Sequence, residues 1–428
     1  MAGLVARSVG RVPSLSAPQR PLRVGQPLWL ADAARGQQRY PALSGRHDAA
    51  VAVVGGGITG ALVAHAFATA GISTTVLEAA AVGRGSTAAS SALLLKEPDL
   101  ELTQLTNRYG VRRSRRIWEL SHQSVDQLIA LLKRRRIRCD LKMRDAVYYA
   151  TTAQAAERLR QEHELRARLG FESEWLGPVR LRRLTGITGH GAVLTKASAQ
   201  FDPYRACVGI LRAASAAGAH VFERSEVRRI EKTPDGVCIS TRHGTLHADR
   251  VVIATGYATP RFRPLAGRFR MYRTYVLATE PLDIGQRDDV GLSDVMVWDT
   301  ERPYHYARWT PDHRLLLGGG DRLVKPGQQR GQHSGTAARD LRAYFDAQLP
   351  ALATVRTERV WEGLFAVTAD SLPYIGPHRR YPRHWFALGY GGNGMTFGSL
   401  AARLLLERWQ GVKSRDHALF EFARLRRP

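Results

Sequence analysis

Residues 50–78 alternate between apolar and polar stretches in the manner of a strand–turn–helix–strand unit. Ala50 to Val54 is an uninterrupted apolar run, typical of a parallel strand buried on both faces. Small residues over 61–70 predict a helix, and a β-branched run over 73–77 predicts a second strand that ends at Glu78. We therefore expect a β-α-β unit near the start of the chain.

The same patterns continue along the rest of the sequence. Spaced apolar positions predict helices over 100–138, 153–169, 335–348 and 395–410, and an Asp-Pro start predicts another over 203–217 that Asp202 caps. Short apolar or alternating runs predict strands at 145–151, 220–222, 227–231, 237–241, 246–248 and 249–256, the fourth and fifth forming a hairpin. Residues 270–320 alternate as an antiparallel sheet does. The fold class is therefore α/β with an α+β part.

The turn of the first unit carries G-x-G-x-x-G, formed by Gly55, Gly57 and Gly60. These glycines allow a tight turn, close approach of a pyrophosphate, and close packing of helix on strand, and the helix start favours the phosphate charge. Glu78 lies where an acidic residue accepts the ribose hydroxyls. Because strands flank this motif, a dinucleotide site is a better interpretation than an ordinary glycine turn. The motif and its strands do not distinguish FAD from NAD.

Three further stretches fit a bound dinucleotide. The small-residue loop over 82–92 suits a segment that lies against a flat cofactor, and Gly85, Ser86 and Thr87 can face phosphate or ribitol oxygens. The strand over 249–256 would bring Thr255 and Gly256 beside the dinucleotide. The third is the glycine-rich stretch over 389–398. The alternatives are a plain linker for the first and an ordinary glycine turn for the last.

The charge of the chain is unusual for a metabolic enzyme. The 428 residues carry a net charge of +25, and basic clusters lie over 112–116 and 133–138. A GC-rich genome accounts for such an excess of arginine, and weak electrostatic binding to an anionic surface is the functional alternative. No run is long and apolar enough for a membrane span, and the three scattered cysteines form no metal pattern, so we expect a cytoplasmic protein without a metal site.

These motifs occur in the order found in the FAD-dependent D-amino-acid oxidase family (glycine oxidase, sarcosine oxidase and γ-glutamylputrescine oxidase-like), which the chain resembles from about residue 27 onward. The motifs that carry the resemblance are VAVVGGGITGA with Glu78, the GRGST loop, DRVVIATG, WEGL with TADSLPYIG, and ALGYGGNGMTFG. The resemblance implies a Rossmann-like, discontinuous FAD-binding domain and a substrate domain with a mainly antiparallel sheet. It assigns residues 48–98, 195–260 and 362–415 to the first domain and residues 99–194 and 261–361 to the second.

The outer segments and the cofactor residues complete this interpretation. Residues 1–47 would be a basic leader and an N-terminal arm, ordered from about Pro27 with Trp29 and Tyr40 packed on the surface of the domain, and residues 416–428 a C-terminal tail.

No Cys or His can be argued to attach the flavin, so the FAD would be non-covalent. The resemblance places 389–395, including Tyr390, at the pyrimidine end of the flavin. The expected cofactor-binding residues are Gly55, Gly57, Ile58, Thr59, Gly60, Glu78, Gly85, Ser86, Thr87, Val227, Thr255, Gly256, Gly391, Gly392, Asn393, Gly394, Met395 and Thr396.

The substrate end departs from the family at one position. Glycine-oxidase-like members continue the W-x-G-L block with an arginine that pairs with the substrate carboxylate, whereas Phe365 stands there in this chain. Strand alternation puts Tyr306 and Arg308 on one face with Tyr304, and His305 on the other. The candidate catalytic residues are Tyr306, Arg308, His305 and Lys96. Arg308 would be a substrate anchor or part of a structural ion pair. His305 would be a catalytic group or a satisfied sheet histidine, and Lys96 would be a cation near flavin N5 or an exposed residue.

Two functions follow. The first is an FAD-dependent oxidation of a C–N bond in a small-molecule amine or amino-acid-like substrate, by hydride transfer to flavin N5. The second is an FAD-bearing basic protein that acts on or binds nucleic acid or anionic membrane. An NAD-dependent dehydrogenase is disfavoured, because it has no use for the later ATG and GGNG blocks. Substrate, electron acceptor and oligomeric state cannot be predicted from the sequence.

Overall fold

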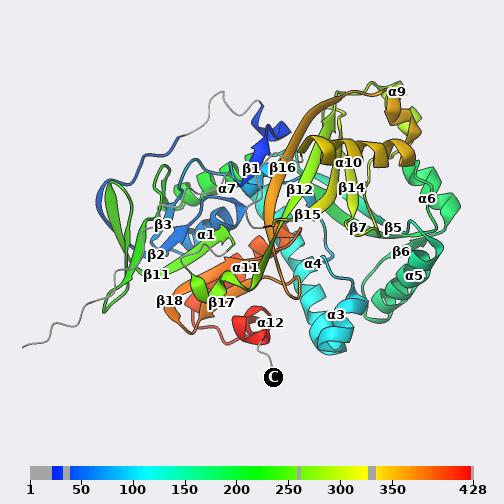
Figure 1. The fold of residues 1–428 in the computed structure, drawn as a ribbon. Helices are drawn as coiled ribbons and strands as arrows, with labels where there is room; N and C mark the ends of the chain where they lie inside the picture. Colours follow the sequence, from blue (N-terminus) through cyan, green and yellow to red (C-terminus); the bar gives the residue numbers. More distant parts are fainter. Residues whose placement is uncertain (1–21, 32–38, 258–261, 326–333, 426–428) are drawn as a thin grey trace, which may run out of the picture.

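Two sheets form the two halves of the molecule in this computed structural model (Figure 1). The structure describes residues 22–31, 39–257, 262–325 and 334–425. The helices are α1 (Ile58–Thr69), α2 (Ser86–Ala89), α3 (Leu102–Tyr109), α4 (Val111–Arg134), α5 (Ala153–Arg168), α6 (Pro178–Thr185), α7 (Pro203–Ala216), α8 (Arg263–Ala266), α9 (Ile284–Val290), α10 (Ser334–Gln348), α11 (Gly394–Trp409) and α12 (Asp416–Phe420), with 3₁₀ turns η1 (Leu28–Leu30), η2 (Pro350–Thr354) and η3 (Phe422–Leu425).

The smaller sheet has eight strands and contains the predicted β-α-β unit. Its main path runs β17-β18-β11-β2-β3-β8, and β9 and β10 extend from β11. The bounds are β2 (Gly45–Val54), β3 (Thr74–Leu77), β8 (His220–Phe222), β9 (Arg229–Lys232), β10 (Val237–Ser240), β11 (Gly244–Gly256), β17 (Tyr374–His378) and β18 (Tyr381–Leu388). The central strands β8, β3, β2, β11 and β18 are parallel, as expected for strands buried on both faces.

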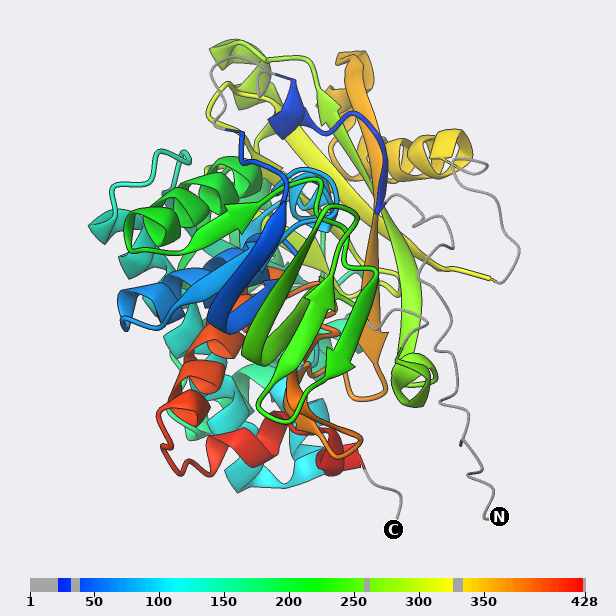
Figure 2. The same cartoon turned by 90° about the vertical axis from the view of Figure 1, so that its left-hand side faces the viewer.

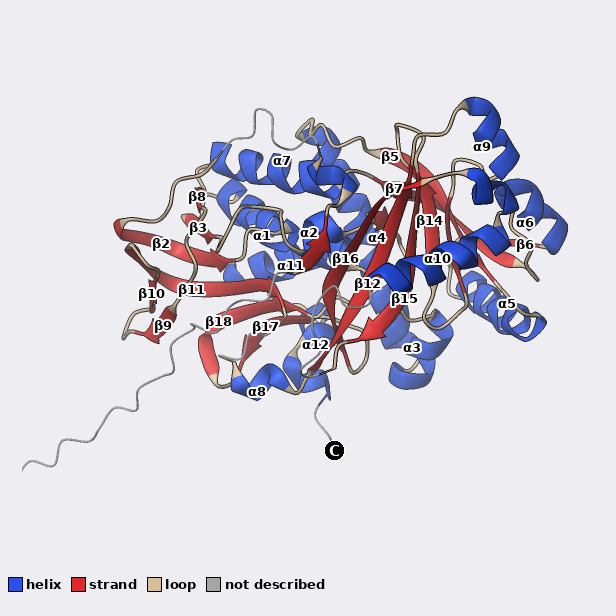
Figure 3. Ribbon diagram, turned by 45° about the horizontal axis from the view of Figure 1, so that its top comes forward, coloured by secondary structure: helices blue, strands red, loops and turns tan. Residues whose placement is uncertain are grey.

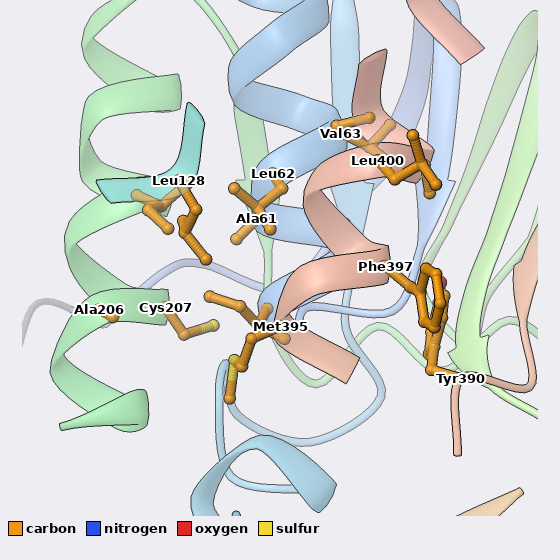
Figure 4. Close-up of a cluster of buried hydrophobic side chains, with 14 of the residues drawn as sticks. Ala61, Leu62, Val63, Leu128, Ala206, Cys207, Tyr390, Met395, Phe397 and Leu400 are labelled. Atoms are coloured by element: carbon orange, nitrogen blue, oxygen red, sulfur yellow. The ribbon is translucent and has the colours of Figure 1, made fainter. Parts of the chain in front are cut away.

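Helices α1, α7 and α11 cover one face of this sheet. They meet in a core where Leu62, Cys207 and Leu400 are buried, and Figure 4 shows side chains of all three helices turned toward one another. On the opposite face, the β9–β10–β11 ribbon, α8 and η3 build a second core. Both faces are therefore covered, and only the carboxyl ends of the strands face the other half of the molecule.

The larger sheet has ten strands, with a main path β1-β16-β12-β15-β14-β13-β5-β7-β4 and β6 paired with β7. The bounds are β1 (Arg23–Gly25), β4 (Leu93–Leu94), β5 (Lys142–Tyr149), β6 (Glu174–Leu176), β7 (Ala192–Gln200), β12 (Phe269–Thr279), β13 (Met296–Asp299), β14 (His305–Trp309), β15 (Leu315–Leu323) and β16 (Thr357–Thr368). Helix α10 lies across one face, over β12 and β15 (Figure 3). The predicted antiparallel pairing over 270–320 is confirmed for β12, β14 and β15.

Several predicted boundaries are corrected. The strands predicted at 246–248 and 249–256 form one long strand, β11, because its first part pairs with β10 while its pairing with β2 runs from Gly244 to Ile253. The helix predicted over 100–138 is broken at Gly110, whose φ of 75° ends α3 before α4 begins. The strand predicted to start at Val227 begins only at Arg229. The capping of α7 by Asp202 is confirmed, since its side chain accepts from two backbone N–H groups.

An N-terminal arm lies over the junction of the two halves. Strand β1 pairs antiparallel with β16, and Figure 2 shows this segment running beside the long strands of the larger sheet. The expectation that Trp29 and Tyr40 pack onto the domain is confirmed, since both are buried. The Trp29 indole donates to the carbonyl of Ser90 at 2.8 Å. The predicted basic leader over residues 1–21 lies outside the described residues.

The C-terminal segment is anchored rather than loose. In η3, Arg424 donates to both carboxylate oxygens of Asp370, at 2.7 and 3.0 Å, and both side chains are almost fully buried. Phe422 stacks on Tyr374 with ring centroids 4.4 Å apart. Residues 416–425, expected to be a tail, are therefore packed against the smaller sheet.

Candidate active site

One cavity of about 400 Å³ runs from the carboxyl ends of β2 and β3 to the face of the larger sheet. Most of the predicted cofactor residues line it. The lining includes Gly55, Gly57, Ile58, Thr59, Glu78, Gly85, Ser86, Thr87, Val227, Thr255, Gly256, Gly391, Gly392, Asn393, Gly394 and Met395. The other two residues of the predicted set, Gly60 and Thr396, do not line the cavity.

The glycine turn has the geometry that its spacing predicts. Gly55 has a φ of +114° and donates its N–H to the carbonyl of Leu77 at 2.9 Å. A Cβ at Gly60 would collide with the carbonyl oxygen of Gly55, so only glycine allows α1 to start this close to β2. Gly57 is the N-cap of α1 and has no side chain that would cover the free N–H groups of the first turn.

Glu78 closes the far side of the turn. Its carboxylate accepts the N–H of Gly56 at 2.8 Å and that of Ala80 at 2.9 Å. Burial raises the pKa of Glu78, and these backbone hydrogen bonds act against that rise. An open glycine cradle at a helix start with a fixed acidic group beside it fits the pyrophosphate and ribose of a dinucleotide.

The small-residue loop predicted over 82–92 contains the short helix α2. Thr87 Oγ1 accepts the N–H of Ile58 at 3.0 Å, and Ser86 donates its hydroxyl proton to the carbonyl of Leu364 at 2.7 Å. Trp361 donates to the carbonyl of Ala89 at 3.0 Å. The Ser86 proton, expected to be free for a phosphate or ribitol oxygen, instead ties α2 to β16, together with Trp361.

The glycine loop before α11 is tied to residues 95–99, a segment in which the sequence interpretation had named only Lys96 as a candidate. The Gly392 N–H donates to Asp99 Oδ2 at 2.7 Å, the Asn393 side chain donates to the carbonyl of Glu97 at 2.6 Å, and Thr396 Oγ1 donates to the carbonyl of Leu95 at 3.1 Å. Three hydrogen bonds thus hold 392–396 against 95–99.

Fewer backbone donors of this loop remain available to a flavin than expected. The Gly391 N–H donates to the carbonyl of Ala366, and the Asn393 N–H donates to that of Tyr390. The Tyr390 hydroxyl donates to the carbonyl of Ala387. The first intrahelical bond of α11 starts at Phe397, so the N–H groups without an intrahelical acceptor are those of residues 394–396.

Beyond this loop the cavity widens against aromatic side chains of the larger sheet. Tyr148 and Trp298 stack with centroids 5.2 Å apart, and the Tyr148 hydroxyl donates to Glu101 at 2.8 Å. Arg302 reaches the Tyr148 hydroxyl with Nη2 at 3.3 Å. The lining of this end is completed by Asp99, Tyr304, Tyr306 and Phe365. It suits a small substrate with apolar carbons and a charged group.

The alternation predicted for β14 holds, but its arginine is not at the cavity. Tyr306 lines the cavity beside Tyr304, whereas Arg308 is outside the lining. The guanidinium of Arg308 is buried and donates to three backbone carbonyls, those of Ser91, Phe201 and Trp309. Because these bonds occupy its planar guanidinium group, Arg308 has a structural role here. Its hydrogen-bond partners are carbonyl oxygens and not the acidic residue of the ion pair considered as the alternative.

His305 and Lys96 also lie outside the lining. His305 Nδ1 is 2.9 Å from Asp299 Oδ2, and its ring stacks on Tyr344 at 3.7 Å, which is the arrangement of a satisfied sheet histidine. Lys96 pairs with Asp126 of α4 at 3.7 Å. Neither side chain is aimed at the space where a flavin and a substrate would meet.

Replacing Lys96 with methionine tests this placement. Since its partner Asp126 is largely exposed, the pair contributes little, and we expect FAD content and turnover within about twofold of the unmodified protein. Flavin absorbance and steady-state kinetics measure both. A loss of activity by about tenfold or more with FAD retained would instead put this cation at the reacting centre.

The carboxylates and the arginine of the chamber were missed because no motif contains them. Asp99 and Glu101 follow Pro98 in a short irregular segment, and Arg302 lies in the turn between β13 and β14. The one available signal was position, since residues 97–101 lie a few residues after the small-residue loop over 82–92. Among the described residues no group of His, Cys, Asp and Glu suits a metal ion, and no helix is long and apolar enough to cross a membrane.

Comparison with known proteins agrees with this geometry. Residues 50–408 match the family model described as FAD dependent oxidoreductase. The chain is 28% identical to gamma-glutamylputrescine oxidoreductase of Escherichia coli over 383 residues, covering 86% of this chain and 85% of that protein. Glycine oxidase of Bacillus subtilis is 25% identical, with 85% and 94% covered. The crystal structure of glycine oxidase from Geobacillus kaustophilus superposes with a TM-score of 0.75 at 21% identity, covering 89% of this chain and 100% of that one.

Proposed function

The chain belongs to the family of FAD-dependent oxidoreductases, and from this premise we propose that it oxidises a C–N bond of a small amine or amino-acid-like substrate. The observation that carries the proposal is the single cavity, in which the dinucleotide turn and the aromatic, carboxylate-lined chamber are continuous. The named activities of the relatives on glycine and on gamma-glutamylputrescine support a substrate with an oxidisable amine.

Different residues along the cavity would bind the cofactor and the substrate. When bound, FAD supplies the hydride acceptor. The glycine turn and Glu78 would hold its pyrophosphate and ribose without a covalent bond, and the first turn of α11 would face its pyrimidine end. In the chamber, Tyr304, Tyr306 and Phe365 would orient the substrate carbon and exclude water.

The position of Phe365 argues against a simple α-amino acid as substrate. It lines the cavity and stacks on Tyr272 at 5.9 Å, so no guanidinium is presented from this strand position. The lining arginines are Arg302 and Arg166, and Arg166 is already bonded to Glu162 and Glu97. We infer that an amine without an adjacent carboxylate fits better than a free amino acid, or that Arg302 takes the carboxylate.

The visible spectrum of the purified protein tests the proposal. Under anaerobic conditions we expect flavin absorbance at about 450 nm that bleaches with amines and not with alcohols of matched shape. Pairs of an amino acid and its decarboxylated amine show whether a carboxylate is required. Flavin that no amine or amino acid bleaches would contradict C–N oxidation while leaving the family assignment intact.

The alternative, a basic protein bound to nucleic acid or anionic membrane, stays a prediction. Two arginines of its proposed basic cluster over 112–116 already have acidic partners. Arg115 pairs with Glu119 at 3.1 Å, and Arg116 pairs with Asp416 at 2.7 Å. This cluster therefore gives no support for the second function over the first.

A further inference from the structure

Asp99 occupies a special place among the carboxylates of the chamber. Its Oδ2 accepts the Gly392 N–H at 2.7 Å, which fixes the carboxylate against the glycine loop. A Cβ at Gly391 would collide with this oxygen, and a Cβ at Gly392 would lie 3.0 Å from Oδ1 and 2.8 Å from the Tyr304 hydroxyl. Backbone, carboxylate and phenol are therefore in close contact at the point where the loop meets the chamber.

The neighbouring carboxylates are engaged in other bonds. Glu101 accepts from the Tyr148 hydroxyl at 2.8 Å, and Glu97 Oε1 accepts from Arg166 at 3.2 Å. Within the part of the chain that the structure describes, Asp99 Oδ1 has no hydrogen-bond donor. Among the same residues Glu97 Oε2 also has no hydrogen-bond partner, but Asp99 is the carboxylate whose other oxygen is bonded directly to the loop that the family resemblance places at the flavin.

The groups around Asp99 set its proton affinity. Burial raises its pKa to about 6, while the Gly392 N–H and the charge of Arg302 act in the opposite direction. Burial raises the pKa of Asp321 on β15 to about 7, and the charge of Asp99 raises it further. At neutral pH, Asp99 is a carboxylate whose proton affinity is close to that needed for proton transfer.

We propose that Asp99 is a catalytic base that removes a proton from the substrate ammonium, so that the nitrogen is neutral when the adjacent carbon loses its hydride. The proposal rests on the proposed function. One N–H bond of the ammonium breaks and an O–H bond forms at Asp99 Oδ1. The nitrogen lone pair would then form the C=N bond, and FAD, when bound, would supply the acceptor for the hydride and its two electrons. Asp99 loses its proton to water before the next turnover.

The replacement Asp99→Asn is the direct test, because asparagine keeps the volume and an oxygen for the Gly392 N–H but cannot take the proton. At pH 7 and saturating amine, we expect the rate of anaerobic flavin reduction to fall by roughly 10²–10⁴-fold. That rate should then rise about tenfold per pH unit until the amine in solution is neutral, because the variant can use only neutral amine. FAD content should remain as in the unmodified protein.

A matched control removes a carboxylate outside the cavity. Asp126→Asn changes the same chemical group on the exposed face of α4, and we expect its rate and pH profile to be those of the unmodified protein. An Asp99→Asn variant whose rate and pH profile match the unmodified protein would overturn the proposal. So would a lower rate in this variant with an unchanged pH profile, which is the result expected of a structural role.

A measurement on the unmodified protein keeps the test valid if the variant does not retain FAD. A series of amines of similar size and decreasing basicity is compared at pH 7. With Asp99 as base, the reduction rate should change only weakly along this series. Without a base it should rise about tenfold for each unit by which the pKa of the amine falls, because more of the amine in solution is then neutral. If no amine bleaches the flavin, the proposed function fails; if all bleach it with the steep dependence, only the role of Asp99 fails.

Discussion

A Gly60→Ala variant is expected to be purified with little or no FAD. The added Cβ would collide with the Gly55 carbonyl oxygen, so α1 must move away from β2 and carry the cradle with it. We expect the affinity for FAD to fall by about 10–100-fold, the scale of one or two lost hydrogen bonds to a charged group. Overpacking of this kind also lowers the free energy of unfolding by about 1–3 kcal/mol.

The measurements are the ratio of flavin to protein absorbance and a titration of the apoprotein with FAD. Gly177→Ala is the matched control, because Gly177 has a φ of −69° and an added Cβ there meets nothing within 4 Å. It should bind FAD as the unmodified protein does. Full FAD occupancy and unchanged stability in Gly60→Ala would show that the start of α1 does not form the cofactor cradle as described.

The second large effect is expected from Arg424→Ala, far from the cavity. Removing this side chain leaves the buried Asp370 carboxylate without its cation, and breaking a buried pair in this way costs about 3–5 kcal/mol. Burial acts to raise the pKa of Asp370, but hydrogen bonds and charge from Arg424 hold it below the usual value. The pair therefore stabilises the fold above the ordinary carboxyl pKa, and this stabilisation is lost as the pH falls through the lowered one.

Chemical denaturation at several pH values tests this prediction. The difference in free energy of unfolding between the unmodified protein and Arg424→Ala should be largest near neutral pH. It should shrink as the pH falls below the ordinary carboxyl pKa of about 4 and toward the lowered pKa of Asp370. Arg356→Ala is the control, because Arg356 makes a similar pair with Glu280 at 2.7 Å but is 80% exposed. The free energy of unfolding of Arg356→Ala should be close to that of the unmodified protein. Equal losses from the two variants would contradict the importance of burial.

The sequence predicted the cofactor half of the molecule well, because local rules determine it. A strand buried on both faces, a glycine turn and a small-residue helix each constrain a few neighbouring residues, so the β-α-β unit, Glu78 and the capping of α7 by Asp202 could be predicted. The antiparallel pairing over 270–320 was predictable from alternation. In each case the signal lies within one element or two adjacent ones.

The substrate half depends on contacts between distant segments, and that is where the sequence interpretation was incomplete. Asp99 is defined by its contact with Gly392, and no periodicity links those two positions. Alternation correctly grouped Arg308 with Tyr306 on one face, but it could not show that the carbonyls of Ser91 and Phe201 occupy the guanidinium. A side-chain direction can be predicted from a strand, whereas its partners depend on how the chain folds back.

The pairing of β1 with β16 has a consequence for the order in which the protein is built. Ribosomes release the N-terminal residues first, and domains fold as they emerge. The partner of Arg23 is Gly363, near the other end of the chain, so the arm has nothing to pair with during most of synthesis. Leu22, next to this strand, lines the cavity, so this part of the cavity wall can be completed only late in synthesis.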